Sequence, residues 1–173
     1  MLVGNRVRLS AMVTTDVEAI LKIYEEGIQT GHATFEAEVP DWHKWDSGHL
    51  TQCRWVAEEG NTVLGWVALT QVSPRKVYSG VAEVSIYVSG TAQNQGIGSI
   101  LLERLIISSE ESCFWTLQAQ LFPENEISIH VHEKHGFRIS GTRRQLSLMT
   151  YGSMEGKWRD VVLMERRSTI AGI

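Results

Sequence analysis

Between about residues 15 and 29, apolar residues recur every three or four positions, as they do on the buried face of a helix. These residues are Val17, Ile20, Leu21, Tyr24 and Ile28. Thr15 and Glu18 have the spacing of a capping box at the start of this predicted helix. A second, weaker helix is predicted over residues 41–50, where two tryptophans lie three positions apart.

In the middle of the chain the pattern changes to that of strands. Residues 54–58 and 62–72 are rich in β-forming residues and are separated by a short turn, which predicts an antiparallel hairpin. The segment VAEVSIYV, residues 81–88, is rich in β-branched residues and lies between Gly80 and Gly90. It therefore predicts a central strand.

The last part of the chain alternates between helices and strands. Apolar residues at helical spacing follow the glycine-rich segment at residues 93–99 and continue to a polar run at residues 108–112. Beyond them we predict a strand over residues 114–122, a helix over residues 125–135 ended by Gly136, and strands over residues 137–140 and 158–164. This order predicts an α+β fold with helices on the faces of a mixed sheet.

Composition narrows the class of protein. With 173 residues, 43% hydrophobic and 21% charged, the chain is expected to form a single domain over residues 1–173. We expect a cytoplasmic protein with no membrane partner, because the chain has no membrane-length apolar stretch, no secretory signal and only two cysteines, Cys53 and Cys113. The net charge of −4 and scattered basic residues argue against a nucleic-acid partner.

The segment QNQGIGS, residues 93–99, lies between a predicted strand and a predicted helix. Gly96 and Gly98 allow a ligand to approach the backbone, and a helix N-terminus attracts anions. The same glycines could simply shape a tight turn, and the residues alone leave both interpretations open. Ser99 and Ile100 stand where a Walker A loop needs lysine, and the mid-chain position disfavours a dinucleotide fold.

The loop resembles the Gln/Arg-x-x-Gly-x-Gly/Ala pyrophosphate loop of the GNAT superfamily of N-acetyltransferases. YVSGTAQNQGIGSILLERL resembles the family's fourth strand, loop and third helix, and FPENEISIHVHEKHGF its Asn-x-x-Ser segment and following helix. IYEEGIQTGHATFE, GVAEVSIYV, WTLQAQLFPEN and GKWRDVVLME resemble the phosphinothricin and methionine sulfoximine acetyltransferases, the L-amino acid N-acyltransferase group. The matches run from the first helix to about residue 165.

This resemblance implies the GNAT fold: a mixed, mostly antiparallel sheet with a V-shaped splay between strands 4 and 5, flanked by α-helices. It implies acetyl-CoA as co-substrate and no metal. The implied acetyl-CoA contacts are Ile86, Tyr87, Val88, Gln93, Asn94, Gln95, Gly96, Ile97, Gly98, Ser99, Asn125, Ser128 and Lys134. Taken as isolated residues, Asn125 equally suits a helix N-cap, and Lys134 a solvated surface position.

Two residues match catalytic positions of the group. Glu83 matches the carboxylate that serves as general base, which would take the proton of the substrate ammonium. An exposed or ion-paired strand glutamate is the alternative. His132 stands where many members have a tyrosine that protonates the departing thiolate, and histidine can donate that proton. The alternative is a packed histidine bonded to a carbonyl group.

The three nearby histidines do not predict a metal site. On a helix, His130 and His132 point about 200° apart, which leaves only His132 and His135 on a shared face. Two ligands are too few for zinc.

The resemblance also implies a small amino-acid-like acceptor, such as phosphinothricin, methionine sulfoximine or methionine sulfone. Thr34, Phe35 and Glu83 match acceptor-site positions of the group, and the loop before residue 81 offers Ser73, Arg75 and Tyr78 as further candidate contacts. Arg75 would bind the carboxylate as a two-pronged donor, although a solvated hairpin loop is the alternative. Trp158 and Asp160 match the group's final strand, and because its members are commonly homodimers we expect a homodimer.

The sequence thus predicts an acetyl-CoA-dependent N-acetyltransferase that acetylates the α-amine of such an acceptor by direct attack in a ternary complex. A covalent acetyl-cysteine step has no support, because neither cysteine falls in a catalytic motif. The alternatives are a non-catalytic acyl-CoA-binding sensor or regulatory module, and an acetyltransferase for protein N-termini or polyamines.

Overall fold

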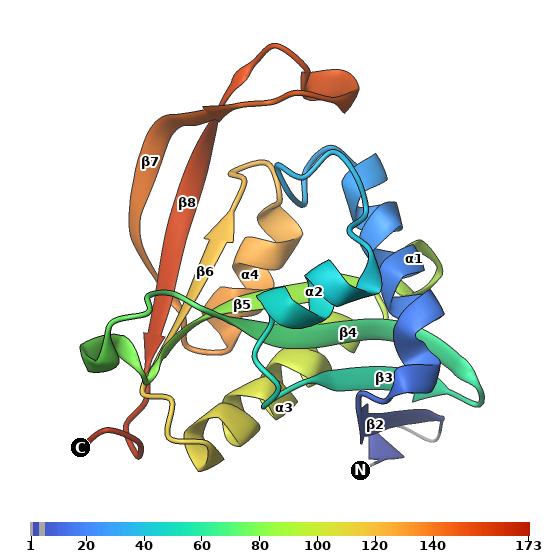
Figure 1. The fold of residues 1–173 in the computed structure, drawn as a ribbon, viewed down its shortest axis with the longest axis vertical. Helices are drawn as coiled ribbons and strands as arrows, with labels where there is room; N and C mark the ends of the chain where they lie inside the picture. Colours follow the sequence, from blue (N-terminus) through green and yellow to red (C-terminus); the bar gives the residue numbers. More distant parts are fainter. Residues whose placement is uncertain (1, 4–5) are drawn as a thin grey trace.

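The described strands form one sheet, with the order β1-β2-β3-β4-β5-β6-β8-β7, in the computed structural model, which describes residues 2–3 and 6–173 (Figure 1). All neighbouring strands are antiparallel except β5 and β6, which run parallel. The predicted mixed, mostly antiparallel sheet is confirmed. The strands are β1 Leu2–Val3, β2 Val7–Ala11, β3 Trp55–Glu59, β4 Thr62–Gln71, β5 Val81–Val88, β6 Thr116–Leu121, β7 Arg138–Leu148 and β8 Trp158–Arg167.

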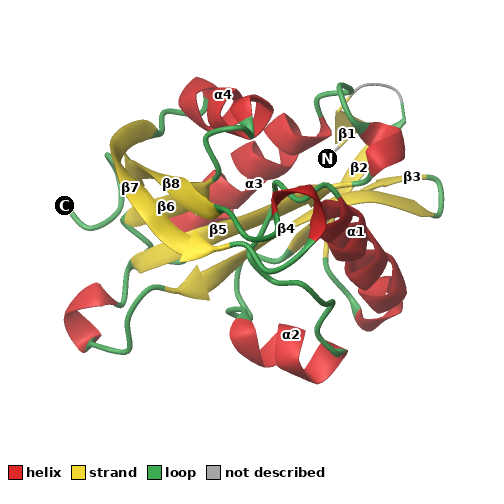
Figure 2. Ribbon diagram, turned by 90° about the horizontal axis from the view of Figure 1, so that it is seen from above, coloured by secondary structure: helices red, strands yellow, loops and turns green. Residues whose placement is uncertain are grey.

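Helices cover both faces of the sheet (Figure 2). α1 Val17–Gln29 and α2 Trp42–Gly48 lie on one face, and α3 Ile97–Glu111 and α4 Glu126–Lys134 lie on the other. α3 has 15 residues, and none of the helices in the described part of the chain combines the length and apolar character needed to cross a membrane.

The central strand β5 separates two hydrophobic clusters. Val84 and the neighbouring Ile86 and Val88 pack in the cluster under α3, whereas Tyr87 packs with Trp66 in the cluster under α1 and α2. Because alternate residues of a strand point to opposite faces, β5 is covered on both sides. The predicted central strand over residues 81–88 is therefore confirmed, and Glu83 lies on the face opposite Val84, Ile86 and Val88.

Two predictions about helix and strand ends are wrong. The capping box of Thr15 and Glu18 does not form, because residues 14–16 make a 3-10 turn in which the Asp16 carboxylate accepts a hydrogen bond from the Val13 N–H at 2.8 Å. β7 continues past Ser140 to Leu148, pairing with β8 although nearly all its residues are exposed. The part of β7 after Ser140 was not predicted because its residues are mostly polar. Alternation of apolar and polar residues identifies a strand only where one face of the strand is buried.

The pairing of β5 with β6 is short. It joins Val81–Glu83 to Thr116–Gln118 and then stops, although β5 continues to Val88 and β6 to Leu121. This divergence confirms the V-shaped splay, between the strands numbered β5 and β6 here. The splay opens toward the ends of both strands.

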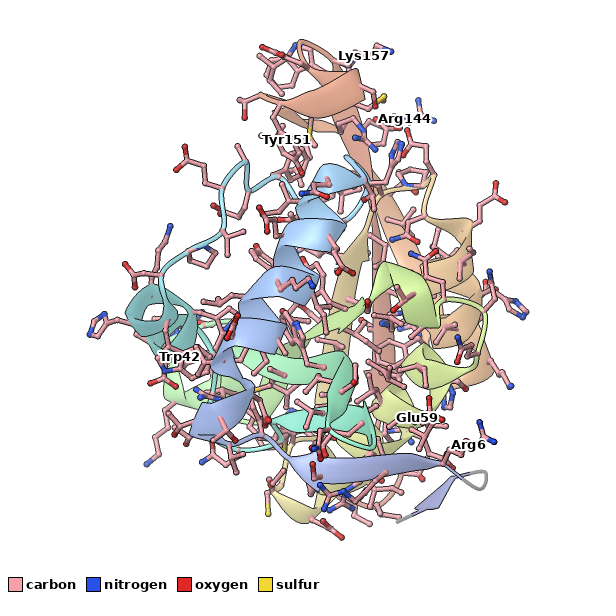
Figure 3. All side chains as sticks on the ribbon, turned by 90° about the vertical axis from the view of Figure 1, so that its right-hand side faces the viewer. Arg6, Trp42, Glu59, Arg144, Tyr151 and Lys157 are labelled. Carbon is pink, nitrogen blue, oxygen red and sulfur yellow. The ribbon has the colours of Figure 1, made fainter. Side chains whose placement is uncertain are left out.

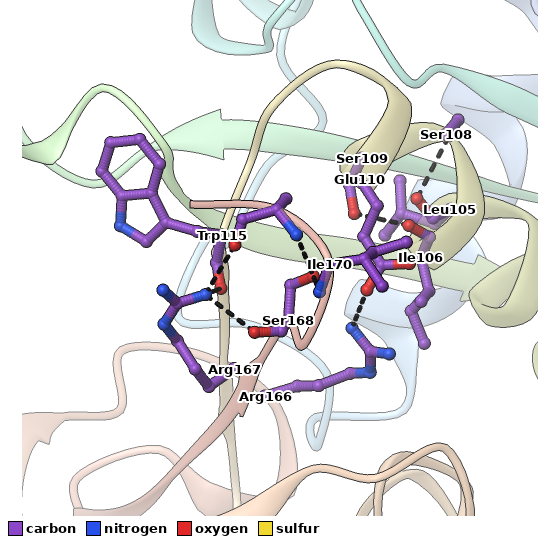
Figure 4. Close-up of polar contacts among 11 residues, drawn as sticks. Leu105, Ile106, Ser108, Ser109, Glu110, Trp115, Arg166, Arg167, Ser168 and Ile170 are labelled. Carbon is purple, nitrogen blue, oxygen red and sulfur yellow. Dashed lines mark hydrogen bonds and ion pairs between the residues drawn. The ribbon is translucent and has the colours of Figure 1, made fainter. Parts of the chain in front are cut away.

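The C-terminal segment packs at the other end of β5 (Figure 4). The Arg167 guanidinium donates hydrogen bonds to the carbonyl groups of Trp115, Ser168, Ala171 and Gly172. The Trp115 ring covers Gly80, so closely that a Cβ atom on Gly80 would lie 2.1 Å from the ring. Because glycine has no Cβ atom, Gly80 leaves room for the Trp115 ring at the position just before β5 begins.

This contact makes Gly80→Ala a severe change. Because the added methyl group overlaps the half-buried Trp115 ring, we expect the free energy of unfolding to fall by about 1–3 kcal/mol. Urea unfolding followed by tryptophan fluorescence measures it. Gly141→Ala is the matched control, since a Cβ atom there meets nothing within 4 Å. Equal stabilities of the two variants would contradict the packing argument.

Candidate active site

Two clefts meet at the splayed end of β5. One, of about 460 Å³, lies between β5, β6 and α2, and we call it the α2 cleft. The other, of about 440 Å³, lies beside the segment 93–99, and we call it the glycine-loop cleft. The residues that line both are Ala33, Ile86, Tyr87, Asn125, Ser128 and His132. Two ligands, one in each cleft, would therefore touch at the splay.

Backbone groups dominate the glycine-loop cleft. Gly96 is the N-cap of α3 with φ of +77°, a conformation that favours glycine. The first N–H groups of α3 have no partner within the helix and carry the positive end of its dipole. No lysine or arginine lines this cleft in the described part of the chain. The cleft thus suits an anion held by the backbone.

Most of the predicted cofactor residues come together here. The residues from the sequence analysis that line this cleft are Ile86, Tyr87, Val88, Gln93, Asn94, Gly96, Ile97, Gly98, Ser99, Asn125 and Ser128. Gln95 and Lys134 do not line it. The Gln95 side chain instead donates to the Thr91 carbonyl group at 3.1 Å.

Asn125 is the N-cap of α4, which is one of the two roles that the sequence analysis considered for it. Its Oδ1 accepts a hydrogen bond from the Ser128 N–H at 3.3 Å, and its Nδ2 donates to the His32 carbonyl group at 3.4 Å. The side chain therefore fixes the start of α4 and also joins the two loops that flank the splay.

A buried arginine that sequence reasoning missed holds the same loops. Arg159 on β8 is 1% exposed. Its guanidinium donates to the Gly31 carbonyl group at 3.0 Å, to His32 Nδ1 at 3.1 Å and to Glu124 Oε2 at 3.0 Å. Burial raises the pKa of the Glu124 carboxyl, but its own backbone N–H and Arg159 outweigh this effect and hold the pKa below its ordinary value. The ion pair therefore persists at neutral pH.

Glu83 lines the α2 cleft at the point where β5 and β6 part. Its Oε2 accepts a hydrogen bond from Gln120 Nε2 at 2.5 Å, and Gln120 Oε1 in turn accepts one from Arg143 at 3.0 Å. Arg143 thus fixes which end of the amide faces Glu83. No described residue forms an ion pair with Glu83, and Gln120 is its one side-chain hydrogen-bond partner among the described residues.

His132 lines both clefts and is 1% exposed. Its Nδ1 lies 2.7 Å from the Ser128 carbonyl oxygen, which only accepts, so Nδ1 carries the proton. Nε2 has no partner among the described residues. Burial lowers the pKa of His132 more than the Ser128 carbonyl group raises it. The free protein therefore holds a neutral ring whose Nε2 accepts hydrogen bonds.

Aromatic rings form one wall of the α2 cleft. Tyr87 stacks on Trp66 at 4.8 Å and meets Tyr24 edge-on at 4.8 Å. Burial raises the pKa of both tyrosines above its ordinary value, so both phenols stay protonated and can donate hydrogen bonds. Phe35, which also lines the α2 cleft, packs edge-on against Phe122 at 4.8 Å.

The segment with Thr34 and Phe35 lines the α2 cleft as expected. The Tyr151 hydroxyl, near the end of the β7–β8 hairpin (Figure 3), donates to the Thr34 carbonyl group at 2.8 Å. The hairpin thereby holds this segment in place.

Ser73, Arg75 and Tyr78 line neither cleft. Their loop precedes β5 at the end where β5 and β6 still pair, whereas the clefts lie at the splayed end. The Arg75 guanidinium lies 5.6 Å from the centre of the Tyr78 ring. The structure therefore does not bring the expected carboxylate-binding arginine to the site.

The histidines in α4 and at its C-cap make separate contacts. His132 bonds the Ser128 carbonyl group, His135 lies 2.7 Å from Ser99 Oγ, and His130 is exposed. Over the residues that the structure describes, no three histidine, cysteine, aspartate or glutamate side chains gather as metal ligands do.

Comparisons with known proteins agree with the resemblance found in the sequence. The model of the Acetyltransferase (GNAT) family matches residues 17–137. A phosphinothricin N-acetyltransferase of Alcaligenes faecalis is 32% identical over 161 residues, which cover 87% of this chain and 77% of that protein. The L-methionine sulfoximine/L-methionine sulfone acetyltransferase of Pseudomonas aeruginosa is 26% identical over 156 residues, which cover 87% of this chain and 88% of that protein.

A solved structure agrees in fold. The crystal structure of a GNAT superfamily phosphinothricin acetyltransferase from Sinorhizobium meliloti in complex with AcCoA superposes with a TM-score of 0.83. The two chains are 26% identical, and the match covers 96% of this chain and 91% of that one.

The buried, neutral state of His132 predicts acid sensitivity. Because its pKa is lowered in the folded protein, the unfolded chain takes up a proton first as pH falls below about 6.5, so stability falls there and is retained above. We expect the unfolding free energy of His132→Gln, measured in urea, to decline less than that of the parent between about pH 7 and pH 5. Parallel declines would contradict this interpretation.

Proposed function

This chain belongs to the GNAT family of acetyltransferases, and we propose that it acetylates the α-amine of a small amino acid or analogue, of the methionine sulfoximine, methionine sulfone or phosphinothricin type. The family and the named relatives make it an acetyl-CoA-dependent N-acetyltransferase. One observation carries the finer proposal: the two clefts meet at the splay, with Glu83 in one and the glycine loop in the other.

The glycine-loop cleft fits acetyl-CoA. The N–H groups at the start of α3 would hold its pyrophosphate, and the splayed edge of β5 at Ile86 and Val88 would hold the pantetheine arm. Bound there, acetyl-CoA supplies a thioester whose carbonyl carbon forms a bond to the amine nitrogen as the carbon–sulfur bond breaks.

Glu83 supplies the base. An ammonium group has no free electron pair, so the amine must lose a proton before it can attack. The Glu83 carboxylate, oriented by Gln120, would accept that proton directly or through a water molecule. Neither Cys53 nor Cys113 lines a cleft, which supports direct transfer.

We assign His132 the role of acid for the departing thiolate. Since Nδ1 is bonded to Ser128, proton transfer must occur through Nε2. Nε2 is unprotonated in the neutral ring, so it would take up the second proton that the amine nitrogen releases as the amide forms and would pass it to the thiolate sulfur as the carbon–sulfur bond breaks.

An amine screen tests the proposal. Purified protein and acetyl-CoA are mixed with methionine sulfone, methionine sulfoximine, phosphinothricin, a polyamine and a peptide with a free N-terminus, and release of free CoA thiol is followed. Turnover restricted to the peptide or the polyamine would move the assignment to that substrate. Calorimetric binding of acetyl-CoA without any turnover would support a sensor.

Glu83→Gln tests the base. The amide keeps the shape of the side chain but cannot take a proton, so we expect kcat/KM for the amino acid to fall by about 10²–10⁴-fold. Calorimetry should show acetyl-CoA binding close to that of the parent. Glu36→Gln is the control, because Glu36 is the other carboxylate of the α2 cleft. Equal losses in both variants would contradict the assignment.

We also propose that the protein is a homodimer, joined through the β7–β8 hairpin. The hairpin projects beyond the rest of the chain (Figure 1), and β7 is an edge strand. Trp158 is 59% exposed and pairs across the strands with Leu148, itself 41% exposed. An exposed edge and apolar pair of this kind favour association.

Trp158→Arg should therefore shift the protein from dimer to monomer, as measured by sedimentation velocity. The charged side chain would be buried without a partner in the dimer. Ile107→Arg on α3 is the control, since Ile107 is also exposed but lies away from the hairpin. A parent protein that sediments as a monomer would contradict the proposal.

A further inference from the structure

Glu83 is held by two successive hydrogen bonds that begin on the β7–β8 hairpin. Arg143 of β7 donates to Gln120 Oε1 at 3.0 Å, and Gln120 Nε2 donates to Glu83 Oε2 at 2.5 Å. Glu83 and Gln120 line the α2 cleft, whereas Arg143 lines neither cleft. A residue outside both clefts is thus connected to the carboxylate that would take the proton.

We propose that Arg143 is a positioning residue for acetyl transfer: acting through Gln120, it fixes the Glu83 carboxylate in the orientation in which it takes the proton of the amine. This inference rests on the proposed function, in which Glu83 is the base. It adds a residue of the β7–β8 hairpin to the parts of the chain that the reaction needs.

Gln120 joins β5 and β6 where their backbone pairing has ended. Glu83 lies opposite Gln118 in the last pair of the ladder, and Gln120 is two residues further along β6. Residues directly opposite one another, and residues two apart on one strand, share a face of the sheet. The Gln120 side chain is therefore on the same face as Glu83, and its amide connects the two strands just beyond the ladder.

The hairpin brings Arg143 to this face as well. Gln120 lies opposite Leu163 on β8, and Arg143 on β7 lies opposite Val161, two residues before Leu163. By the same alternation, Arg143 and Gln120 share a face. The Arg143 guanidinium has no other hydrogen-bond or ion-pair partner among the described residues. Its donors are therefore available to hold the amide.

The donors and acceptors allow one arrangement of the Gln120 amide. An ionised carboxylate only accepts hydrogen bonds, and a guanidinium only donates them. Turning the amide over would place its oxygen against the Glu83 carboxylate and its NH2 group against Arg143, so both hydrogen bonds would be lost. Arg143 thereby keeps Nε2 of the amide on Oε2 of Glu83. The other oxygen, Oε1, has no side-chain partner among the described residues and is left to take the proton.

Gln120 needs the second hydrogen bond because its side chain is exposed. A long side chain loses rotamer freedom when it is held, so a single contact holds it incompletely. Without the bond from Arg143, the amide would leave Glu83 for part of the time, and the carboxylate would turn away from the orientation that transfers the proton. Small misplacements of a reacting group slow the chemical step.

Arg143→Met tests the inference, because methionine keeps an unbranched side chain but cannot donate a hydrogen bond. With the best acceptor of the amine screen, we expect kcat to fall about threefold to tenfold while KM for acetyl-CoA stays at the parent's value. Arg143→Lys should recover most of the loss, since an ammonium group can donate to the Gln120 oxygen.

Arg144→Met is the matched control. Arg144 is the next residue of β7, is also exposed, lines neither cleft and forms no ion pair with a described residue. It should keep the parent's kcat. An equal loss in Arg144→Met and Arg143→Met would show a general effect of charge on the hairpin and would overturn the inference.

A double-mutant cycle tests whether Arg143 acts through Gln120. Gln120→Leu removes the amide and should lower kcat about tenfold to a hundredfold. If Arg143 acts through the amide, Arg143→Met should cause no further loss when it is added to Gln120→Leu. A purely structural role of Arg143 would give the same loss with and without Gln120→Leu.

The failure of this inference is distinct from that of the proposed function. If Glu83→Gln loses activity but Arg143→Met keeps the parent's kcat, or loses as much in the Gln120→Leu variant as in the parent, Arg143 is not a positioning residue and the proposed function stands. If Glu83→Gln keeps the parent's kcat/KM, Glu83 is not the base and both fail.

Discussion

The separation of β5 from β6 after Glu83 is the constraint on which the site depends. Parallel strands normally satisfy each other's backbone groups, but here the ladder ends at Glu83 and Gln118 while both strands continue. Beyond Glu83, the backbone groups of β5 that face β6 therefore have no strand partner and are available to form hydrogen bonds with a ligand. Since alternate residues of β5 reach opposite faces, one short segment serves both clefts.

The two loops that flank the splay must be held in place, and Arg159 makes several of the contacts that do so. A buried guanidinium is costly unless it is paired, and the two terminal nitrogens of Arg159 are paired with Gly31, His32 and Glu124, while its Nε has no partner among the described residues. Because these partners lie in the two loops flanking the splay, removing the charge would loosen both clefts together. The Tyr151 contact with Thr34 extends the same support from the end of the hairpin.

Features that depend on the local chain could be predicted from the sequence. The glycine loop, β5 and the N-cap at Asn125 follow from residue type and spacing, and each was found where predicted. The role of Arg159 and the position of the Arg75 loop could not be predicted, because they depend on which segments the fold brings together at each end of the sheet. An arginine among the apolar residues of GKWRDVVLME was the one available sign of a buried charge.

The two clefts divide recognition between backbone and side chains. In the glycine-loop cleft the ligand-facing charge is the fixed dipole of α3, which substitution of side chains barely alters. In the α2 cleft the charges are those of Lys44, Glu36 and Glu83, and each is a single side chain on a different element. Substitutions in α2 or in the segment around Thr34 can therefore alter the α2 cleft while the glycine-loop cleft keeps its geometry, because the two clefts share only the residues at the splay.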